Sequence, residues 1–139
     1  MFLQQLTARQ KSSFLALVTR VMLADGEVAP EEDVVLLRLK KDLGEGVVAP
    51  AEEIFGVTNS AIFETRRLRR ITYLELMVLA YSDDKIHPDE STVLTEIARA
   101  FEFDAPTVEK LSNWAARFVG SMPADQNLLK AEAETLIDE

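Results

Sequence analysis

Apolar residues recur at steps of three and four along almost the whole chain, and no stretch shows sustained alternation with a period of two. Phe14, Leu17, Val18 and Val21 are one such series. Residues spaced in this way lie on one face of an α-helix and can be buried together. The pattern therefore predicts an all-α protein, a helical bundle of about six or seven helices.

Proline, glycine and aspartate mark the expected helix ends. Pro30 and Pro88 open helices, because the N–H that proline lacks has no partner in the first turn. Gly44 closes a helix, since glycine accepts the left-handed conformation. Asp104 is the expected N-cap of a helix with Trp114 at the edge of its buried face. The expected helices cover about 5–24, 30–43, 67–82, 88–101, 105–119 and a segment from Pro123 that bears Leu128, with short helical pieces near 51–55 and 60–66.

The charge balance limits the classes of partner. The 139 residues include 15 Lys and Arg and 24 Asp and Glu, which gives a formal net charge of −9. Nucleic-acid binding depends on Lys and Arg that displace counterions, so we expect none. The longest apolar run, Leu76–Tyr81, is far shorter than the roughly 20 residues of a transmembrane helix. No signal peptide is expected either.

The chain has no cysteine and one histidine. It therefore has no disulfide, no thiolate zinc site and no pair of histidines to hold a metal, and we expect no Ser-His-Asp triad within the chain. This composition suits a cytoplasmic protein. No nucleophile elbow or phosphate loop accompanies its carboxylates, so we expect no enzymatic activity, and a carboxylate-based hydrolase is the least favoured of three hypotheses.

An acidic segment occurs twice, 58 residues apart. Residues 25–32 and 83–90 share the pattern D-x-x-(V/I)-x-P-(D/E)-E, and similar apolar residues follow both copies. Each copy reads as helix, acidic turn, helix, and two such hairpins can pack together in a pseudo-symmetric bundle. We expect a single domain over 1–139, with the repeat over about 15–45 and 73–103 and C-terminal helices over about 105–139.

Two interpretations of the acidic turns stay open. Carboxylates in a first turn favour the positive end of the helix dipole, which explains Glu31, Glu32, Asp89 and Glu90 as capping residues. That account leaves the recurrent aspartate at the preceding helix end unexplained. The alternative is a site for Ca²⁺, Mg²⁺ or Mn²⁺, because oxygen donors select hard cations. The turns match only the second half of an EF-hand loop, so a full EF-hand is rejected.

The paired turns resemble those of the TerB-like family, whose founding members are tellurite-resistance proteins. The second copy, Tyr81–Asp84 through Glu90 and on to Asp104, is the closer match, and the resemblance covers about residues 10–105. It implies an all-α bundle, a non-enzymatic role in tellurite or stress response, and a protein partner in a membrane-associated complex. It also implies a divalent-cation site, in which Asp84 stands where the family usually has glycine; the implied ligands are Asp25, Glu31, Glu32, Asp83, Asp84, Asp89 and Glu90.

Four arginines within five residues interrupt the acidic background: Arg66, Arg67, Arg69 and Arg70. Arginines at a helix start oppose the helix dipole, so nearby groups must offset them. One interpretation is pairing with local carboxylates such as Glu52, Glu53 or Glu64. The other is a metal-free scaffold that docks an acidic or phosphorylated partner on these arginines. The sequence leaves the oligomeric state open.

Overall fold

The chain is an all-α helical bundle, which confirms the expected fold class. The computed structural model describes residues 2–24, 30–82 and 88–139, without the side chains of residues 30–33. No helix in these ranges has the length and apolar character needed to cross a membrane. The described elements are α1 (Ala8–Met22), α2 (Pro30–Leu43), α3 (Ala51–Ile54), α4 (Arg66–Ser82), α5 (Pro88–Ala100), α6 (Ala105–Val119) and α7 (Gln126–Asp138), with 3-10 turns η1 (Leu3–Gln5), η2 (Ser60–Ile62) and η3 (Pro123–Asp125).

Local sequence signals set most helix ends as expected. Helices α2 and α5 begin at Pro30 and Pro88. The Asp104 side chain accepts a hydrogen bond from the Thr107 amide at 2.9 Å and caps α6. Gly44 follows α2 with a φ of +109°, a value that favours glycine.

Two expected helices begin later than the sequence indicates, and one expected helical piece is shorter. Helix α1 starts after Thr7, whose hydroxyl accepts from the Gln10 amide while the Gln10 side chain accepts from the Thr7 amide. This capping box fixes the start at Ala8. The piece expected over 60–66 is a single 3-10 turn, and α4 begins separately because Thr65 accepts from the Leu68 amide. Likewise, η3 precedes α7.

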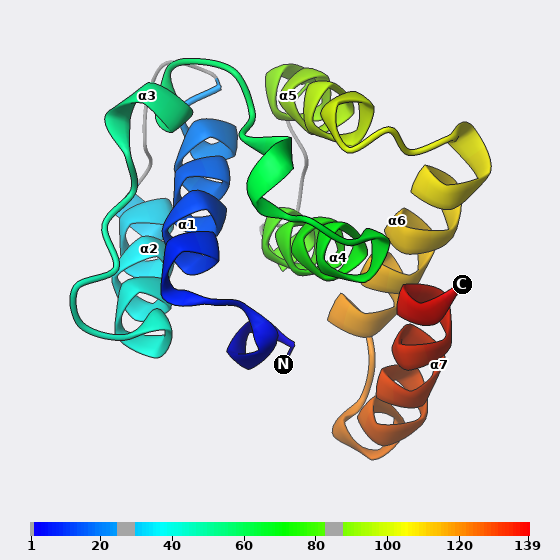
Figure 1. Ribbon diagram of the computed structural model, residues 1–139. Coiled ribbons are helices and arrows are strands. Elements are labelled where there is room, and N and C mark those ends of the chain that lie inside the picture. Colours follow the sequence, from blue (N-terminus) through cyan, green and yellow to red (C-terminus); the bar gives the residue numbers. More distant parts are fainter. Residues whose placement is uncertain (1, 25–29, 83–87) are drawn as a thin grey trace.

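Helix α4 lies at the centre of the molecule (Figure 1) and packs most extensively against α6. It also contacts α1 on one side and α7 on the other. Ile71 and Leu74 are fully buried within it. The contact between α1 and α4 joins the first helices of the two expected hairpins, whereas the pseudo-symmetry between the hairpins stays a prediction.

Burial differs from the sequence expectation in the C-terminal helices. Trp114 was expected at an edge, yet it is only 1% exposed, because α7 packs over it and the Leu129 carbonyl accepts its indole N–H at 2.7 Å. Of the two leucines expected on the apolar stripe of the last helix, Leu129 is buried, whereas Leu128 is 68% exposed. Both differences follow from the direction in which α7 packs back on α6 and α4.

Candidate functional site

Most of the acidic-turn side chains lie outside the described residues. Asp25, Asp83 and Asp84 belong to segments that the structure leaves undescribed, and Glu31 and Glu32 belong to α2 without described side chains. In the first turn of α5, Asp89 is exposed and Glu90 is half-buried. Within the described ranges, no group of three acidic, histidine or cysteine residues is arranged to hold a metal ion. The seven implied ligands therefore stay a prediction.

The arginine cluster contacts the end of α7. Arg66 Nη1 donates to the Glu139 backbone oxygen at 3.0 Å. Arg67 forms an ion pair with Asp138 and lies 3.5 Å from Glu134. These partners are about 70 residues away along the chain, and they differ from the local carboxylates that the sequence suggests. Of those local carboxylates, Glu53 pairs with Arg9.

The other two arginines are more buried. Arg69 donates from Nε to the Phe63 carbonyl at 2.9 Å and lies 3.9 Å from the Glu102 carboxylate. Arg70 is 9% exposed and donates from Nη1 to the Leu136 carbonyl at 2.7 Å. Its Nε is the one buried side-chain nitrogen or oxygen in the described part of the chain that has no hydrogen-bond partner.

These contacts explain why cations are tolerated at the start of α4. Helix α7 ends beside Arg66 and Arg70, and the negative end of its dipole favours nearby positive charge. The carbonyls of a last helical turn also need donors, which these guanidinium groups supply. Arg66, Arg67 and Arg70 therefore form a clamp between α4 and α7.

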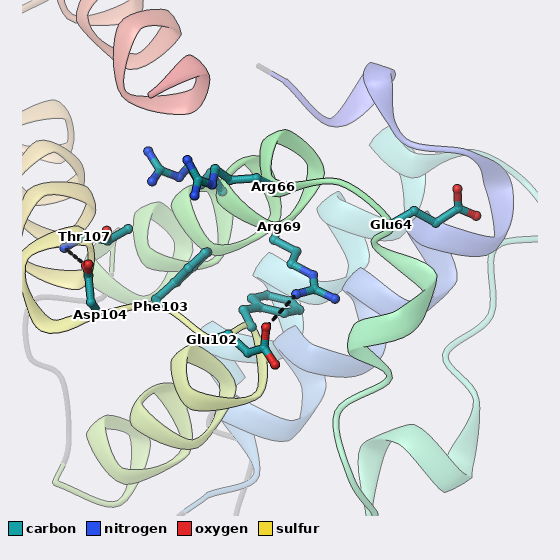
Figure 2. A pocket seen from close by; sticks show the side chains of 9 residues that line it. Glu64, Arg66, Arg69, Glu102, Phe103, Asp104 and Thr107 are labelled. Atoms are coloured by element: carbon teal, nitrogen blue, oxygen red, sulfur yellow. Dashed lines mark hydrogen bonds and ion pairs between the residues drawn. The ribbon is translucent and has the colours of Figure 1, made fainter.

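A cavity of about 280 Å³ lies beside this clamp, where the first turns of α4 meet the segment 101–104 and the first turn of α6. Figure 2 shows Arg69 directed toward Glu102, and Asp104 directed toward Thr107. Arg66 and Arg70 also line the cavity, which we call the arginine pocket. The size suits a small molecule or a single side chain.

Carboxylates share the arginine pocket with the arginines. Glu64 and Glu102 are exposed, and the Glu64 side chain extends away from Arg66 and Arg69 (Figure 2). Hydrogen bonds from Thr107, first from its side chain and then from its backbone amide, lower the pKa of Asp104 below its usual value. The positive charges of Arg70 and Lys110 act in the same direction, so Asp104 is a carboxylate at neutral pH.

The backbone beside the pocket is strained at Glu102. Helix α5 ends in a Schellman motif, in which the Phe103 amide donates to the Ala98 carbonyl and the Glu102 amide to the Arg99 carbonyl, both at 3.0 Å. The motif places Glu102 at a φ of 62°, the only positive value among the described non-glycine residues. Glycine is the usual residue at this position because side chains are disfavoured there. A non-glycine residue in this conformation costs stability, and strained positions of this kind are common at binding sites.

We expect Glu102→Gly to raise the free energy of unfolding by about 1 kcal/mol, because it removes the left-handed strain. Urea unfolding followed by circular dichroism measures the change. Glu109→Gly, in the exposed middle of α6, is the matched control and should lower stability by about 1 kcal/mol. Loss of stability in both variants would contradict a strained Glu102.

Phe63, Tyr73, Phe101 and Phe103 form the aromatic support of the pocket. Phe101 meets Phe63 edge to face at a centroid distance of 5.6 Å, and Phe103 meets Tyr73 in the same way at 5.4 Å. Burial raises the pKa of Tyr73 to about 12, so its phenol stays neutral.

Sequence analysis identified the arginines but missed the pocket, since its other walls come from α5 and α6. A comparison with protein-family models, curated proteins and solved structures finds no match to this chain, so the assignment of a function depends on its own residues.

Proposed function

We propose that this chain is a non-enzymatic binding module that holds a divalent cation at its two acidic turns. The observation that carries the proposal is the repeated eight-residue pattern, 58 residues apart. Helices α2 and α5 both begin at the proline of their copy, which supports equivalent junctions for the two turns. The resemblance to TerB-like proteins extends the proposal to a cytoplasmic role in tellurite or stress response with a protein partner.

The chemistry of the turns favours hard cations. Each copy supplies one aspartate five residues before its proline and two carboxylates directly after that proline. Ca²⁺, Mg²⁺ and Mn²⁺ prefer such oxygen donors, and water molecules complete their coordination. Capping alone accounts for the carboxylates of the first turn, but it gives no reason for Asp25 and Asp83 to recur.

The alternative, a metal-free scaffold that docks partners through Arg66, Arg67, Arg69 and Arg70, has less support. Each of these arginines contacts another part of the same chain. A partner that covered all four would have to displace the end of α7.

Titration of chelator-treated protein with Ca²⁺, Mg²⁺ and Mn²⁺ tests the proposal by melting temperature and by heat of binding. A cation that binds only the folded state adds about 2.7 kcal/mol of stability at 100 times its Kd. We expect Asp25→Ala and Asp83→Ala to abolish the saturable shift while the helical circular dichroism signal is kept. Asp42→Ala makes the same charge change in α2, away from both turns, and should bind as the parent does.

Two results would overturn cation binding. One is that none of the three cations gives a saturable shift in melting temperature at millimolar concentration. The other is an equal loss in the Asp25→Ala and Asp42→Ala variants, because that would trace the effect to net charge rather than to the turns.

A further inference from the structure

The arginine pocket combines three features that together indicate a ligand. Three arginines line a cavity of about 280 Å³. One of them, Arg70, is 9% exposed, and its Nε has no hydrogen-bond partner. A buried donor without an acceptor costs free energy, so such a group is rare unless something else satisfies it. The third feature is the strained backbone of Glu102 at the rim.

We propose that the arginine pocket binds a phosphate group carried by a small organic molecule. Arginine presents a planar fork of donors that matches phosphate oxygens in pairs, and Arg66 is exposed beside the buried Arg70. Among the described residues, Arg66 donates one hydrogen bond, from Nη1 to the Glu139 backbone oxygen. This proposal is independent of the cation site.

The arginine donors of the pocket, rather than its net charge, favour a phosphate over a carboxylate. Glu102 and Asp104 already oppose the arginines, and Asp104 occupies the Thr107 amide at the start of α6. Anion recognition therefore depends on the arginines and not on the helix end. A carboxylate ligand offers two oxygens to these donors, whereas a phosphate monoester offers three and accepts more hydrogen bonds.

The aromatic wall accounts for the organic part of the ligand. Phe101 and Phe103 line the pocket next to the arginines. Phe103 is half-buried, so part of its ring remains accessible. An apolar group attached to the phosphate would cover this surface, and the removal of both apolar surfaces from water would increase the affinity.

The test is a titration with inorganic phosphate, phenyl phosphate and benzoate, followed by NMR of the backbone amides of residues 101–107 and of the Arg70 Nε–H. We expect saturable shifts with both phosphates, tighter binding of phenyl phosphate than of inorganic phosphate, and the weakest binding for benzoate. Arg66→Gln should weaken phenyl phosphate at least about tenfold, which is the loss of one charge-assisted contact. Arg66→Lys, which keeps the charge without the fork, should give an intermediate affinity.

Two further variants test whether charges inside the pocket, rather than the net charge of the protein, control the affinity. Arg117→Gln makes the same charge change at an exposed arginine paired with Glu132, outside the pocket, and should leave the affinity unchanged. Glu102→Gln removes an opposing charge and should tighten binding about threefold or more, since a nearby surface charge contributes up to about 1 kcal/mol. Equal effects of Arg66→Gln and Arg117→Gln, benzoate binding as tight as phenyl phosphate, or no saturable shift would each overturn the proposal.

Discussion

Trp114→Ala is expected to lower the free energy of unfolding by about 3–5 kcal/mol, the range found when a buried aromatic residue is truncated in a core. The side chain is 1% exposed and stacks on Phe118 with a centroid distance of 5.0 Å. Its indole N–H donates to the Leu129 carbonyl, so one residue joins α6 to α7 by packing and by a hydrogen bond. Urea unfolding followed by far-ultraviolet circular dichroism measures the loss.

Trp114→Phe separates the two contributions. Phenylalanine keeps most of the ring contacts but cannot donate to Leu129, so we expect a smaller loss of about 1–3 kcal/mol. A loss below about 1 kcal/mol for the alanine variant would contradict a major contribution of Trp114 to stability, because the cavity left by the missing ring alone costs more than that. Val119→Ala, at a side chain 38% exposed on the same helix, serves as the control and should change stability by much less.

Helix ends were predictable where the signal is local. Pro30 and Pro88 begin their helices and Asp104 caps α6, because each effect involves only residues within one turn. The start of α1 was predicted about three residues early, although Thr7 and Gln10 together form a capping box that the sequence contains. A search for that four-residue pattern would have placed the boundary correctly.

Burial and contacts between distant segments were less predictable. The period of the apolar residues identifies a face of each helix but not the neighbour that covers it. Trp114 is therefore fully buried, although it was expected at an edge, because the path of α7 decides its burial. The arginine cluster was evident from composition alone, yet its partners Asp138 and Glu139 lie about 70 residues away.

The two candidate sites also differ in how much of each the sequence alone reveals. The acidic turns are a sequence pattern, so the repeat reveals them, and the proposed ligands Asp25 and Asp83 can be chosen for substitution without coordinates. The arginine pocket is a tertiary feature: α4 supplies the charge, whereas the ends of α5 and α6 supply Glu102, Phe103 and Asp104. The unpaired Arg70 Nε and the positive φ of Glu102 became visible only in the structure.

Glu53→Ala is expected to lower the free energy of unfolding by about 2–3 kcal/mol, because it removes two charge-assisted hydrogen bonds from a buried position. Glu53 is 5% exposed, and its carboxylate accepts from Ser13 Oγ and from Arg9 Nη2, both at 2.5 Å. Arg9 Nη1 also donates to Ser13 Oγ at 2.7 Å, which closes a three-membered network between α1 and α3. The Arg9 side chain is 49% exposed, so water solvates its charge in the variant and limits the loss.

This network explains how α3 is held in place. A helix of four residues, Ala51–Ile54, is unstable alone, since the cost of nucleation exceeds what so few hydrogen bonds return. Glu53 is its buried residue and anchors it to α1.

A double-mutant cycle of Glu53→Ala with Ser13→Ala, measured by urea unfolding, should give a coupling energy of about 1 kcal/mol or more. Glu52→Ala is the matched control, because Glu52 is exposed on the same turn, and it should change stability by less than about 0.5 kcal/mol. Additive losses in the cycle would mean that Ser13 and Glu53 act separately, and α3 would then be held by apolar packing rather than by the network.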